Sequence, residues 1–470
     1  MKQRLIVLTD IYRRPKDRQT EIDDVQSMIR LLLYANEIDI EGLIAASSFC
    51  YIGGKAEDKK TILDIIDAYA ECLDNLRVHD GRYPDAEYLR KVTKRGIEAY
   101  GRAVGNGFAD EKYTDNEGVR RIIEAVDRDD PRPVWIGIWG GANTLAQAIW
   151  QAEREKSADE FDRFIRKLRI YGIADQDHAG RWLRETYGAK LFYIVSPSSG
   201  DDRKLAGMEF ALGTWTGFSS DFSMKWWGGN KLFAGADNTL VSAQWIRKNV
   251  QGKSPFRKLY PIPKFSMEGD TPSYLGLIDN GLNDMEHPNY GGWGGRYEFG
   301  FPQKYPKRTT PEKFPIWTDA EDTITLESGQ TVTNNFCTIY RFRKAYQNDF
   351  LARLCWSEEG TYQKANHYPV ITDRVPGSIT VQAGEKVTLS AKGSFDPDGD
   401  TLSYKWWSYT EAGSYEETIA FKGDGTDTVI FEAPDKAGTL HIILELTDNG
   451  TPPLTRYRRI IVTVVDGGKW

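Results

Sequence analysis

The chain has 470 residues, too many for one ordinary domain, so two or three domains are expected. Hydrophobic residues make up 40% and charged residues 27% of the sequence, as in a globular protein. The formal net charge is −7 and no basic stripe is present, which argues against nucleic acid as a partner. No apolar run reaches the roughly 18 residues that a membrane-spanning helix needs, so no membrane span is expected.

The cysteines and the first residues bear on the cellular compartment. Four cysteines occur without any C-x-x-C spacing, which argues against a zinc site and leaves their disulfide state open. The sequence opens directly into an apolar run, without a signal peptide. We therefore expect a cytoplasmic protein, or a periplasmic or secreted one whose signal has been removed.

The densest group of carboxylates lies between residues 5 and 30. An apolar run at 5–8 predicts a buried strand, and Asp10 lies where this strand ends. Three more carboxylates precede an apolar-periodic segment that starts at Val25 and predicts a helix with Asp at its N-cap: Glu21, Asp23 and Asp24. Ligands of an open α/β sheet bind at such a strand-to-helix edge, and a hard cation such as Ca²⁺ would relieve the repulsion between the carboxylates. Ordinary helix capping is the alternative for Asp24.

Strands and helices alternate over the first two hundred residues. Apolar runs predict further strands at 38–47, 133–138, 168–174 and 190–195. Apolar residues spaced by three and four predict helices at 59–72, 86–100, 116–126, 145–155 and a further one ending at 163–167. This order predicts right-handed βαβ crossovers and a largely parallel sheet.

Polar clusters follow three of these strands. They lie at Asp10, at 139–143 and at 175–178, so the carboxyl ends of parallel strands would bring them to one edge of the sheet. The pair Gly140-Gly141 permits a tight strand-to-helix turn and a close approach of the backbone to a ligand.

The pattern weakens after residue 196. The stretch 196–307 is rich in Gly, Pro and aromatic residues, with one helix expected at 238–248. A loop-rich segment at 266–298 predicts the wall of an active site. A connecting segment at 316–365 carries a helix at 342–356, which we expect to pack back on the first domain.

Short strands separated by Gly, Asp and Pro turns begin near residue 366. They are predicted at 378–381, 387–391, 402–408, 428–432, 440–446 and 459–465. This spacing predicts an all-β sandwich at 366–470, after an α/β domain at 1–365. The sandwich contains an Asp-Pro-Asp-Gly-Asp loop that looks like the Ca²⁺-bearing turn of polycystic-kidney-disease-type and cadherin-like sandwiches, with metal ligands expected at Asp396, Asp398 and Asp400. A solvated Asp/Gly turn is the alternative.

The opening stretch resembles the nucleoside hydrolases, whose fingerprint after the first strand is D-T-D-x-G-x-D-D. Thr9-Asp10 and Asp23-Asp24 match its second and third parts. Two departures stand out: Leu8 replaces the first Asp, and the insertion 12–20 replaces the short Gly-containing link. The segment 139–146, W-G-G-A-N-T-L-A, resembles the family's T-G-P-L-T-N-L-A turn.

The sequence is more similar to a bacterial branch described as nucleoside-hydrolase-like and cellulose-binding, with an immunoglobulin-like C-terminal domain. Its motifs E-x-D-D, W-G-G-x-N-T-L-A-Q-A, D-Q-D, E-G-D-T-P-S and G-G-W-G-G-R-Y occur at 21–24, 139–148, 175–177, 268–273 and 291–297. The resemblance covers nearly the whole chain. It implies a mainly parallel open α/β sheet flanked by helices, followed by an immunoglobulin-like sandwich, and it says more about fold than about reaction.

The resemblance also implies a metal centre. Asp10, Asp24 and the backbone carbonyl of Trp139 would hold Ca²⁺, while Asp10 would also take a proton from the attacking water and Asp23 would bind sugar hydroxyls. The family's last ligand is an Asp in a His-Asp-Pro sequence. The nearest candidate here is Glu286-His287-Pro288, so the fourth side-chain ligand stays open.

A leaving-group acid is needed as well, and His178 and His287 are the candidates, with Glu268 and Asp270 as alternatives. Trp293 is expected either to stack on a sugar ring or to fill the core. The residues expected around the substrate are Asp23, Asn143, Asp175, Gln176, Asp177, Glu268, Asp270 and Trp293.

Two functions follow from these motifs. The leading one is a metal-assisted hydrolase that cleaves an N- or O-glycosyl bond of a carbohydrate or nucleoside-like molecule. The competing one is a carbohydrate-binding protein that keeps the fold without catalysis. Retention of Asp10, Asp23 and Asp24 favours the first, and loss of the first motif Asp favours the second. The exact substrate and the formation of a homo-oligomer stay open.

Overall fold

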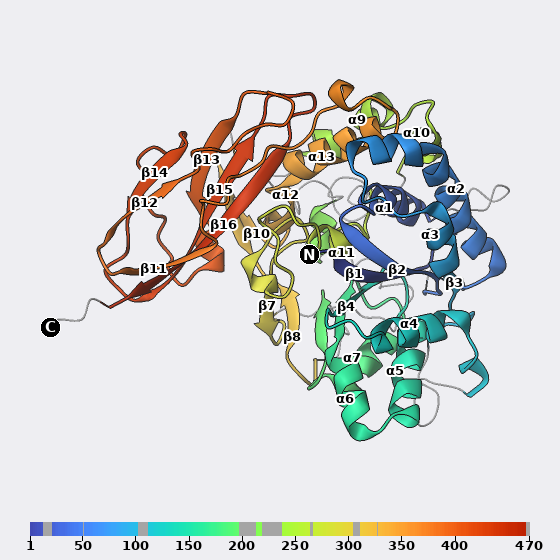
Figure 1. Cartoon of the computed structure of the whole chain (residues 1–470). Coiled ribbons are helices and arrows are strands. Elements are labelled where there is room, and N and C mark those ends of the chain that lie inside the picture. Colours follow the sequence, from blue (N-terminus) through green and yellow to red (C-terminus); the bar gives the residue numbers. More distant parts are fainter. Residues whose placement is uncertain are drawn as a thin grey trace.

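The computed structural model describes residues 1–12, 21–49, 51–101, 111–196, 213–218, 237–263, 267–303, 311–326 and 328–466. Figure 1 shows an α/β domain with a β-sandwich at its side. Most of the insertion at 12–20 and the cysteine at position 50 lie outside the described residues; Cys72, Cys337 and Cys355 are free thiols. In the described part of the chain, no helix is long and apolar enough to cross a membrane.

An eight-stranded sheet forms the centre of the α/β domain, in the order β3-β2-β1-β4-β5-β6-β8-β7. The strands are β1 Gln3–Thr9, β2 Ile38–Ala45, β3 Thr93–Arg95, β4 Val134–Ile138, β5 Leu168–Gly172, β6 Phe192–Val195, β7 Tyr297–Gly300 and β8 Ile316–Asp319. Every neighbouring pair is parallel except β7 and β8, which confirms the mainly parallel open sheet. The strand order reverses between β1 and β4, and ligands of doubly wound folds bind outside the carboxyl ends of the strands at such a point.

Helices cover both faces of this sheet (Figure 1). Alternate residues of β1 serve the two faces: Leu5 and Val7 belong to one core cluster, and Ile6 and Leu8 to the other. The first cluster is completed by α1 Ile22–Leu33, α2 Ala56–His79, α3 Ala86–Val92 and α13 Arg343–Trp356. The second is completed by α4 Glu117–Asp127, α5 Asn143–Glu155, α6 Ala158–Arg166 and α7 Ala179–Tyr187.

The structure corrects three helix predictions. The helix expected at 86–100 ends at Val92, because Thr93–Arg95 pairs with the free edge of β2 as β3. The helix expected at 238–248 is interrupted at Ser242, whose hydroxyl accepts the Trp245 N–H and so starts a new helix. The N-cap of α1 is Glu21, so Asp24 lies in the first turn of the helix instead of capping it.

Short elements fill the region after β6. They are the helices η2 Thr214–Gly217, η4 Asn238–Val241, α9 Ala243–Asn249, α10 Pro255–Leu259, α11 Pro272–Leu275, η5 Pro288–Tyr290, α12 Cys337–Tyr340 and η6 Tyr362–Lys364, and the hairpin of β9 Asp322–Thr325 with β10 Thr331–Asn334. A further turn, η1 Glu111–Tyr113, precedes α4. The helix α13 packs against α1, where its backbone carbonyl at Tyr346 accepts a bond from Arg30.

The carboxyl-terminal domain is a β-sandwich, as expected. One sheet has the order β11-β16-β15-β13 and the other consists of β12 and β14. The strands are β11 Ser378–Gln382, β12 Lys386–Ser390, β13 Ser403–Ser408, β14 Thr428–Glu432, β15 Gly438–Thr447 and β16 Thr455–Val465, with η7 Thr410–Ala412 between β13 and β14. Each of the strands β11 to β16 corresponds to a predicted strand.

The sandwich is joined to the α/β domain by backbone hydrogen bonds. The N–H groups of Tyr457 and Arg459 in β16 donate to the carbonyls of Asn280 (2.9 Å) and Gly281 (3.0 Å). Gly281 adopts φ 82°, and a Cβ there would overlap the Tyr457 carbonyl, so only glycine permits this approach. The division expected at residues 365 and 366 stays a prediction.

Candidate functional site

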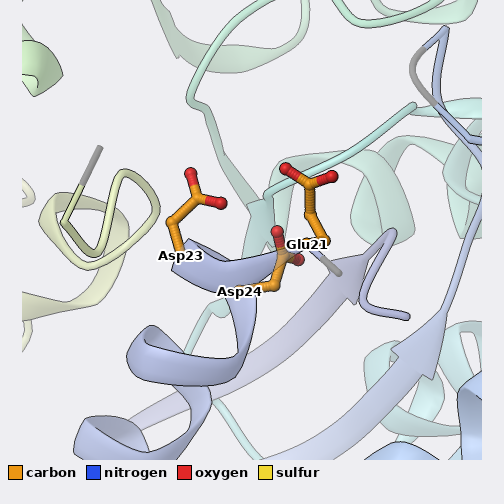
Figure 2. A group of neighbouring side chains, drawn as sticks. All are labelled: Glu21, Asp23 and Asp24. Atoms are coloured by element: carbon orange, nitrogen blue, oxygen red, sulfur yellow. The ribbon is translucent and has the colours of Figure 1, made fainter. Parts of the chain in front are cut away.

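Carboxylates from three separate segments gather at the carboxyl edge of the sheet. Asp10 follows β1 directly, and Asp23 and Asp24 stand in the first turn of α1. Figure 2 shows Asp23 and Asp24 with Glu21 at the amino end of that helix. Carboxylate oxygens of Glu21, Asp23 and Asp24 all lie within 4.8 Å of one another.

Asp10 is buried against the turn between β4 and α5. It is 2% exposed, and Ser48 in the loop after β2 donates its hydroxyl to Asp10 Oδ2. A Cβ at Gly140 would lie 2.8 Å from Asp10 Oδ1, so a glycine is needed for this close approach. Burial raises the pKa of Asp10 to about 7.

Asp24 and Asp270 complete the cluster. Thr9 donates its hydroxyl to Asp24, and burial together with the charges of Asp270, Asp10 and Asp23 raises the pKa of Asp24 well above its usual range. Burial and the neighbouring carboxylates of Asp23, Asp10 and Glu21 do the same to the pKa of Asp270. Asp270 is 3% exposed, and its Oδ2 has no hydrogen-bond partner among the described residues. Such an oxygen is costly to bury unless a ligand satisfies it.

The loop that carries Asp270 is fixed by Glu268. This residue adopts the left-handed conformation, with φ 49°, which is unusual for a residue with a side chain. Its carboxylate is fully buried and paired with Arg30 of α1, and Tyr260 also donates its hydroxyl to it. Glu268 therefore anchors the loop to α1, while Asp270, two residues on, enters the cluster.

The segment 284–288 lies at the opposite edge of the sheet, where the strands begin. Glu286 pairs at 2.8 Å with Arg169, near the start of β5, and thus at the amino edge. His287 is exposed, binds Asp284 and stacks on Tyr290. Asp270 is therefore the better placed candidate for the ligand that the sequence left open.

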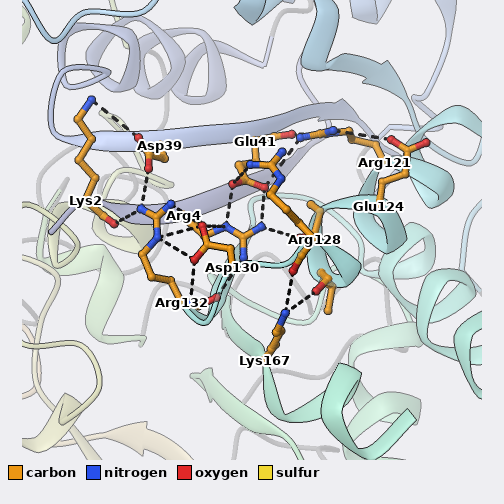
Figure 3. Close-up of polar contacts among 12 residues, drawn as sticks. Lys2, Arg4, Asp39, Glu41, Arg121, Glu124, Arg128, Asp130, Arg132 and Lys167 are labelled. Carbon is orange, nitrogen blue, oxygen red and sulfur yellow. Dashed lines mark hydrogen bonds and ion pairs between the residues drawn. The ribbon is translucent and has the colours of Figure 1, made fainter. Parts of the chain in front are cut away.

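The amino edge of the sheet differs from the carboxyl edge in its charge balance. Arg4 is fully buried and binds Glu41 at 2.7 Å, and Arg128 binds the same carboxylate at 2.8 Å (Figure 3). Arg132 pairs with Asp130 and Asp39. At the carboxyl edge, in contrast, no described Lys or Arg forms an ion pair with Asp10, Asp24 or Asp270. Carboxylates left without cations in this way favour an external cation.

The remaining clusters meet at the same edge, as predicted. A Cβ at Gly141 would lie 2.5 Å from Asp177 Oδ2, and this oxygen accepts the backbone N–H of Asn143 at 3.1 Å. Asp177 Oδ1 accepts the N–H of Ala179 at 2.9 Å. Burial raises the pKa of Asp177 to about 7, against these N–H donors. The Gln176 amide donates to the Trp139 carbonyl, the expected backbone ligand.

Two of the residues predicted to contact substrate, Asp175 and Asn143, have hydrogen-bond partners within the protein. Asp175 forms a double hydrogen bond with Arg184, which also binds Glu312. The Asn143 side chain donates to the carbonyl of Ala99. These contacts hold loops of the carboxyl edge together.

Trp293 lies in the core, whereas His178 lies at the carboxyl edge of the sheet. Trp293 is fully buried between Tyr346 and Tyr457, in the core. His178 precedes α7, with its ring edge against Tyr100. Its loop lies at the carboxyl edge of the sheet.

The metal ligands predicted in the sandwich do not form a compact group. Among the described residues, Glu21, Asp23 and Asp24 form the one group of three or more His, Cys, Asp or Glu side chains with all ligand atoms within 4.8 Å. Asp398 accepts bonds from His367, while Asp396 Oδ1 accepts the N–H groups of Asp398 and Asp400.

The motifs assigned no role to Thr9 and Ser48, the two hydroxyl donors of the cluster. Thr9 ends the buried strand β1, and Ser48 follows the buried strand β2. A hydroxyl residue at the end of a buried strand, next to a motif carboxylate, is the sequence feature that could have identified them.

The donor set at the carboxyl edge suits a hard divalent cation. It consists of the compact group Glu21, Asp23 and Asp24 with the buried carboxylates of Asp10 and Asp270 beside it, and one oxygen of Asp270 lacks any partner among the described residues. Ca²⁺ prefers such all-oxygen sites.

Comparison with known proteins gives two family matches. Residues 4–297 match the model described as "Cellulose-binding Sde182, nucleoside hydrolase-like domain", and residues 386–464 match "Cellulose-binding protein Sde0182, C-terminal domain". No curated protein matches the chain.

Solved structures agree with these matches. The chain is similar to a nucleoside hydrolase-related hypothetical protein from Saccharophagus degradans "that is associated with carbohydrate metabolism", at 30% identity over 99% of this chain and 100% of that one, with a TM-score of 0.75. A PKD domain from KIAA 1837 protein matches 21% of this chain and 92% of its own, at 14% identity and a TM-score of 0.17. A mouse PcdhgC3 EC1-3 structure matches 22% of this chain and 34% of its own, at 17% identity and 0.15. The last two scores are too low to support an argument.

Proposed function

The chain belongs to the family of cellulose-binding, Sde182-type proteins with a nucleoside hydrolase-like domain, and from that membership we propose that it hydrolyses a glycosidic bond at the carboxyl edge of its sheet. The bond is N- or O-glycosyl, and the substrate is a carbohydrate or a nucleoside-like molecule. The observation that supports this best is the burial of Asp10, Asp24 and Asp270 together, without a described cationic partner.

The cluster is the proposed Ca²⁺ site. Asp10, Asp24 and Asp270 would hold the ion, with Glu21 and Asp23 at the amino end of α1 beside them. The ion would offset the repulsion between the carboxylates and lower the pKa of water next to it.

The protein's own groups have separate tasks in this proposal. Asp10 accepts a proton from the attacking water, and the hydroxyl of Ser48 orients its other oxygen. Asp23 accepts hydrogen bonds from sugar hydroxyls. The surrounding carboxylates stabilise the positive charge that an oxocarbenium-like transition state develops at the anomeric carbon. His178 is the candidate leaving-group acid; His287 lies beside the amino edge and has no part.

The test is an assay of product release. The full chain is incubated with nucleosides and with cello-oligosaccharides, with CaCl₂ or with EDTA, and released base and reducing sugar are measured. We expect activity that requires Ca²⁺ and falls about 100-fold or more in Asp10→Asn, the range seen when a general base is removed. The matched control is Asp284→Asn, whose partner is the exposed His287. Undiminished activity in Asp10→Asn would contradict the proposal.

A second function has its own support. Leu8 replaces the first motif Asp, is fully buried and packs in the core between the sheet and α4 to α7. A protein that lost this carboxylate and kept the others could bind carbohydrate without cleaving it, as the family's description suggests. A polysaccharide partner would fit a periplasmic or secreted protein. Retention of the chain on insoluble cellulose, with no reducing sugar released, would favour this function.

A further inference from the structure

Three buried oxygen atoms without hydrogen-bond partners lie where the linker between α13 and β11, residues 357–377, enters the sandwich. They are Asn366 Oδ1, Asp396 Oδ2 and Asp448 Oδ2, and no described residue satisfies them. Asn366 is 7% exposed and Asp448 3% exposed. Buried polar atoms in folded proteins are nearly always paired, so three such oxygens in one region call for a common explanation.

Side-chain hydrogen bonds bring the three segments together. Asn366 Nδ2 donates to Asp448 Oδ1 at 3.0 Å. The N–H of Thr401, at the end of the loop that begins with Asp396, donates to Asn449 Oδ1 at 2.8 Å. The linker, the loop after β12 and the loop after β15 therefore meet at one place.

The other oxygen of each carboxylate is held by N–H donors. Asp448 Oδ1 also accepts the N–H groups of Gly450 (2.9 Å) and Leu454 (3.1 Å). Asp396 Oδ1 accepts those of Asp398 (2.9 Å) and Asp400 (3.1 Å). This bonding fixes the orientation of both carboxylates and leaves one oxygen of each for another ligand. No ion pair of a described Lys, Arg or His involves Asp396 or Asp448.

We propose that Asn366, Asp396 and Asp448 bind a Ca²⁺ ion at this junction. Two carboxylate oxygens and one amide oxygen are hard ligands of the kind that Ca²⁺ takes, and the ion would balance their two negative charges. The set differs from the one predicted from the Asp-Pro-Asp-Gly-Asp loop alone. Asp398 is bound by His367, and its place is taken by ligands from two other segments.

The position of the ion gives it a second effect. Asn366 is followed by His367, whose Nε2 lies 2.9 Å from Nδ1 of His79 at the end of α2. His367 is also stacked on Tyr362 at 3.7 Å. Ca²⁺ on Asn366 would therefore hold the linker, which runs from α13 to the sandwich and contacts α2 through His367, so binding should stabilise the docked sandwich as well as its loops.

Calorimetric titration of the full chain with CaCl₂ tests the site. We expect Asp448→Asn to lose one Ca²⁺, or to bind it at least tenfold more weakly, because the amide keeps the N–H acceptor but removes the charge. The titration is repeated in an Asp24→Asn background, in which the site at the carboxyl edge is weakened, so that failure of one site does not hide the other. The control is Asp435→Asn, an exposed carboxylate of the same domain.

Unchanged Ca²⁺ binding in Asp448→Asn, or loss of all binding in Asp24→Asn alone, would overturn the proposal. Should Asp448→Asn fail to fold, Asn366→Asp provides a second test. This variant adds a carboxylate beside Asp448 and removes a donor, so its melting temperature should fall in EDTA and rise more than that of the wild type on addition of CaCl₂. A rise equal to that of the wild type would contradict a site at Asn366.

Discussion

Two acidic residues of one loop differ sharply in their surroundings. Glu268 is fully buried but bound by Arg30, whereas Asp270 is buried among other carboxylates. The first is a satisfied ion pair and the second is a source of repulsion in the free protein. Their substitutions should therefore have opposite effects on stability.

Glu268→Gln should destabilise the protein by about 3–5 kcal/mol, because it leaves the guanidinium of Arg30 without its counter-charge in the core. Urea denaturation gives the change in the free energy of unfolding. The control is Glu298→Gln, whose carboxylate is 62% exposed and lies 3.7 Å from Arg296. A loss below about 1 kcal/mol in Glu268→Gln, the size expected of an exposed pair, would show that the pair is not the anchor of this loop.

Asp270→Asn should raise the melting temperature in EDTA and weaken Ca²⁺ binding at least tenfold. An Asp whose folded pKa is raised costs stability at every pH above its unfolded pKa, so removing the charge stabilises the free protein. Removing a ligand weakens the ion's binding. Melting curves with EDTA and with CaCl₂ measure both effects; a lower melting temperature in EDTA would refute the repulsion argument.

Residues on regular elements could be placed from periodicity, whereas the loop residue Asp270 was expected near the substrate only from the E-G-D-T-P-S motif, and its proposed place among the Ca²⁺ ligands was not predicted. Asp10 follows a strand and Asp24 lies in the first turn of the next helix, so the order of these two elements predicted that both carboxylates lie at one edge of the sheet. Asp270 reaches them through the left-handed turn at Glu268 and its pairing with Arg30, a contact between residues far apart in sequence. No local pattern contains that information.

At the scale of elements, the turn between β4 and α5 depends on two adjacent glycines. Gly140 lies against Asp10, and Gly141 lies against Asp177 and the Ser47 carbonyl. Each glycine is thus in contact with a different carboxylate of the site. The turn joins the loops of β1, β4 and β5 into one edge.

Gly141→Ala should destabilise the protein by about 1–3 kcal/mol, the range for overpacking a close contact. A Cβ would lie 2.5 Å from Asp177 Oδ2, so the carboxylate or the turn must move. Denaturation measures the loss. Gly300→Ala in β7 is the control, since a Cβ there meets nothing within 4 Å. Equal stability of the two variants would show that the turn accommodates a Cβ at position 141 without strain.

Periodicity located most long elements, because their apolar faces are continuous. It failed where tertiary pairing decided the outcome. Residues 93–95 join β2 as a strand although they continue a helical pattern, and β7 and β8 are too short to show a period.

At the scale of the whole molecule, the sandwich shares a core with the α/β domain. Tyr409, Ile443 and Tyr457 belong to the core cluster that contains α1 and α13. Arg459 binds the carbonyls of Leu282 (3.1 Å) and Gly291 (2.7 Å) and the Nδ1 of His441 (3.0 Å). The sequence predicted the sandwich strands but could not show this docking, because alternation distinguishes buried from exposed faces and does not say what buries them.

Acid should weaken this interface through His441. Burial and the neighbouring Arg459 lower the pKa of His441 from 6.5 to about 3. Between these pH values the unfolded chain binds a proton at His441 that the folded chain excludes. The free energy of unfolding is therefore unaffected by His441 above pH 6.5 and decreases as the pH falls from 6.5 toward 3. At pH 5 the loss amounts to about 2 kcal/mol, since each unit below 6.5 costs roughly 1.4 kcal/mol.

Denaturation of the wild type and of His441→Asn at about pH 7.5 and pH 5 measures this effect. The amide oxygen of Asn can still accept the Arg459 bond but does not titrate in this range. The stability difference between the two pH values should therefore be smaller in the variant by about 2 kcal/mol. Identical pH dependence in both proteins would exclude His441 as the source.

The order of the strands has a consequence for synthesis on the ribosome. The neighbour of β6 in the sheet is β8, and Ile194 pairs with Trp317 only after the intervening region has emerged. Arg30 can form its hydrogen bonds with Glu268 and with Gln347 of α13 only after still more of the chain has been synthesised. Contacts of such long sequence separation form slowly, and a nascent chain that lacks them exposes apolar surface. Chains truncated before α13 should therefore associate with chaperones or aggregate, and the α/β domain should reach its native state only near the end of translation.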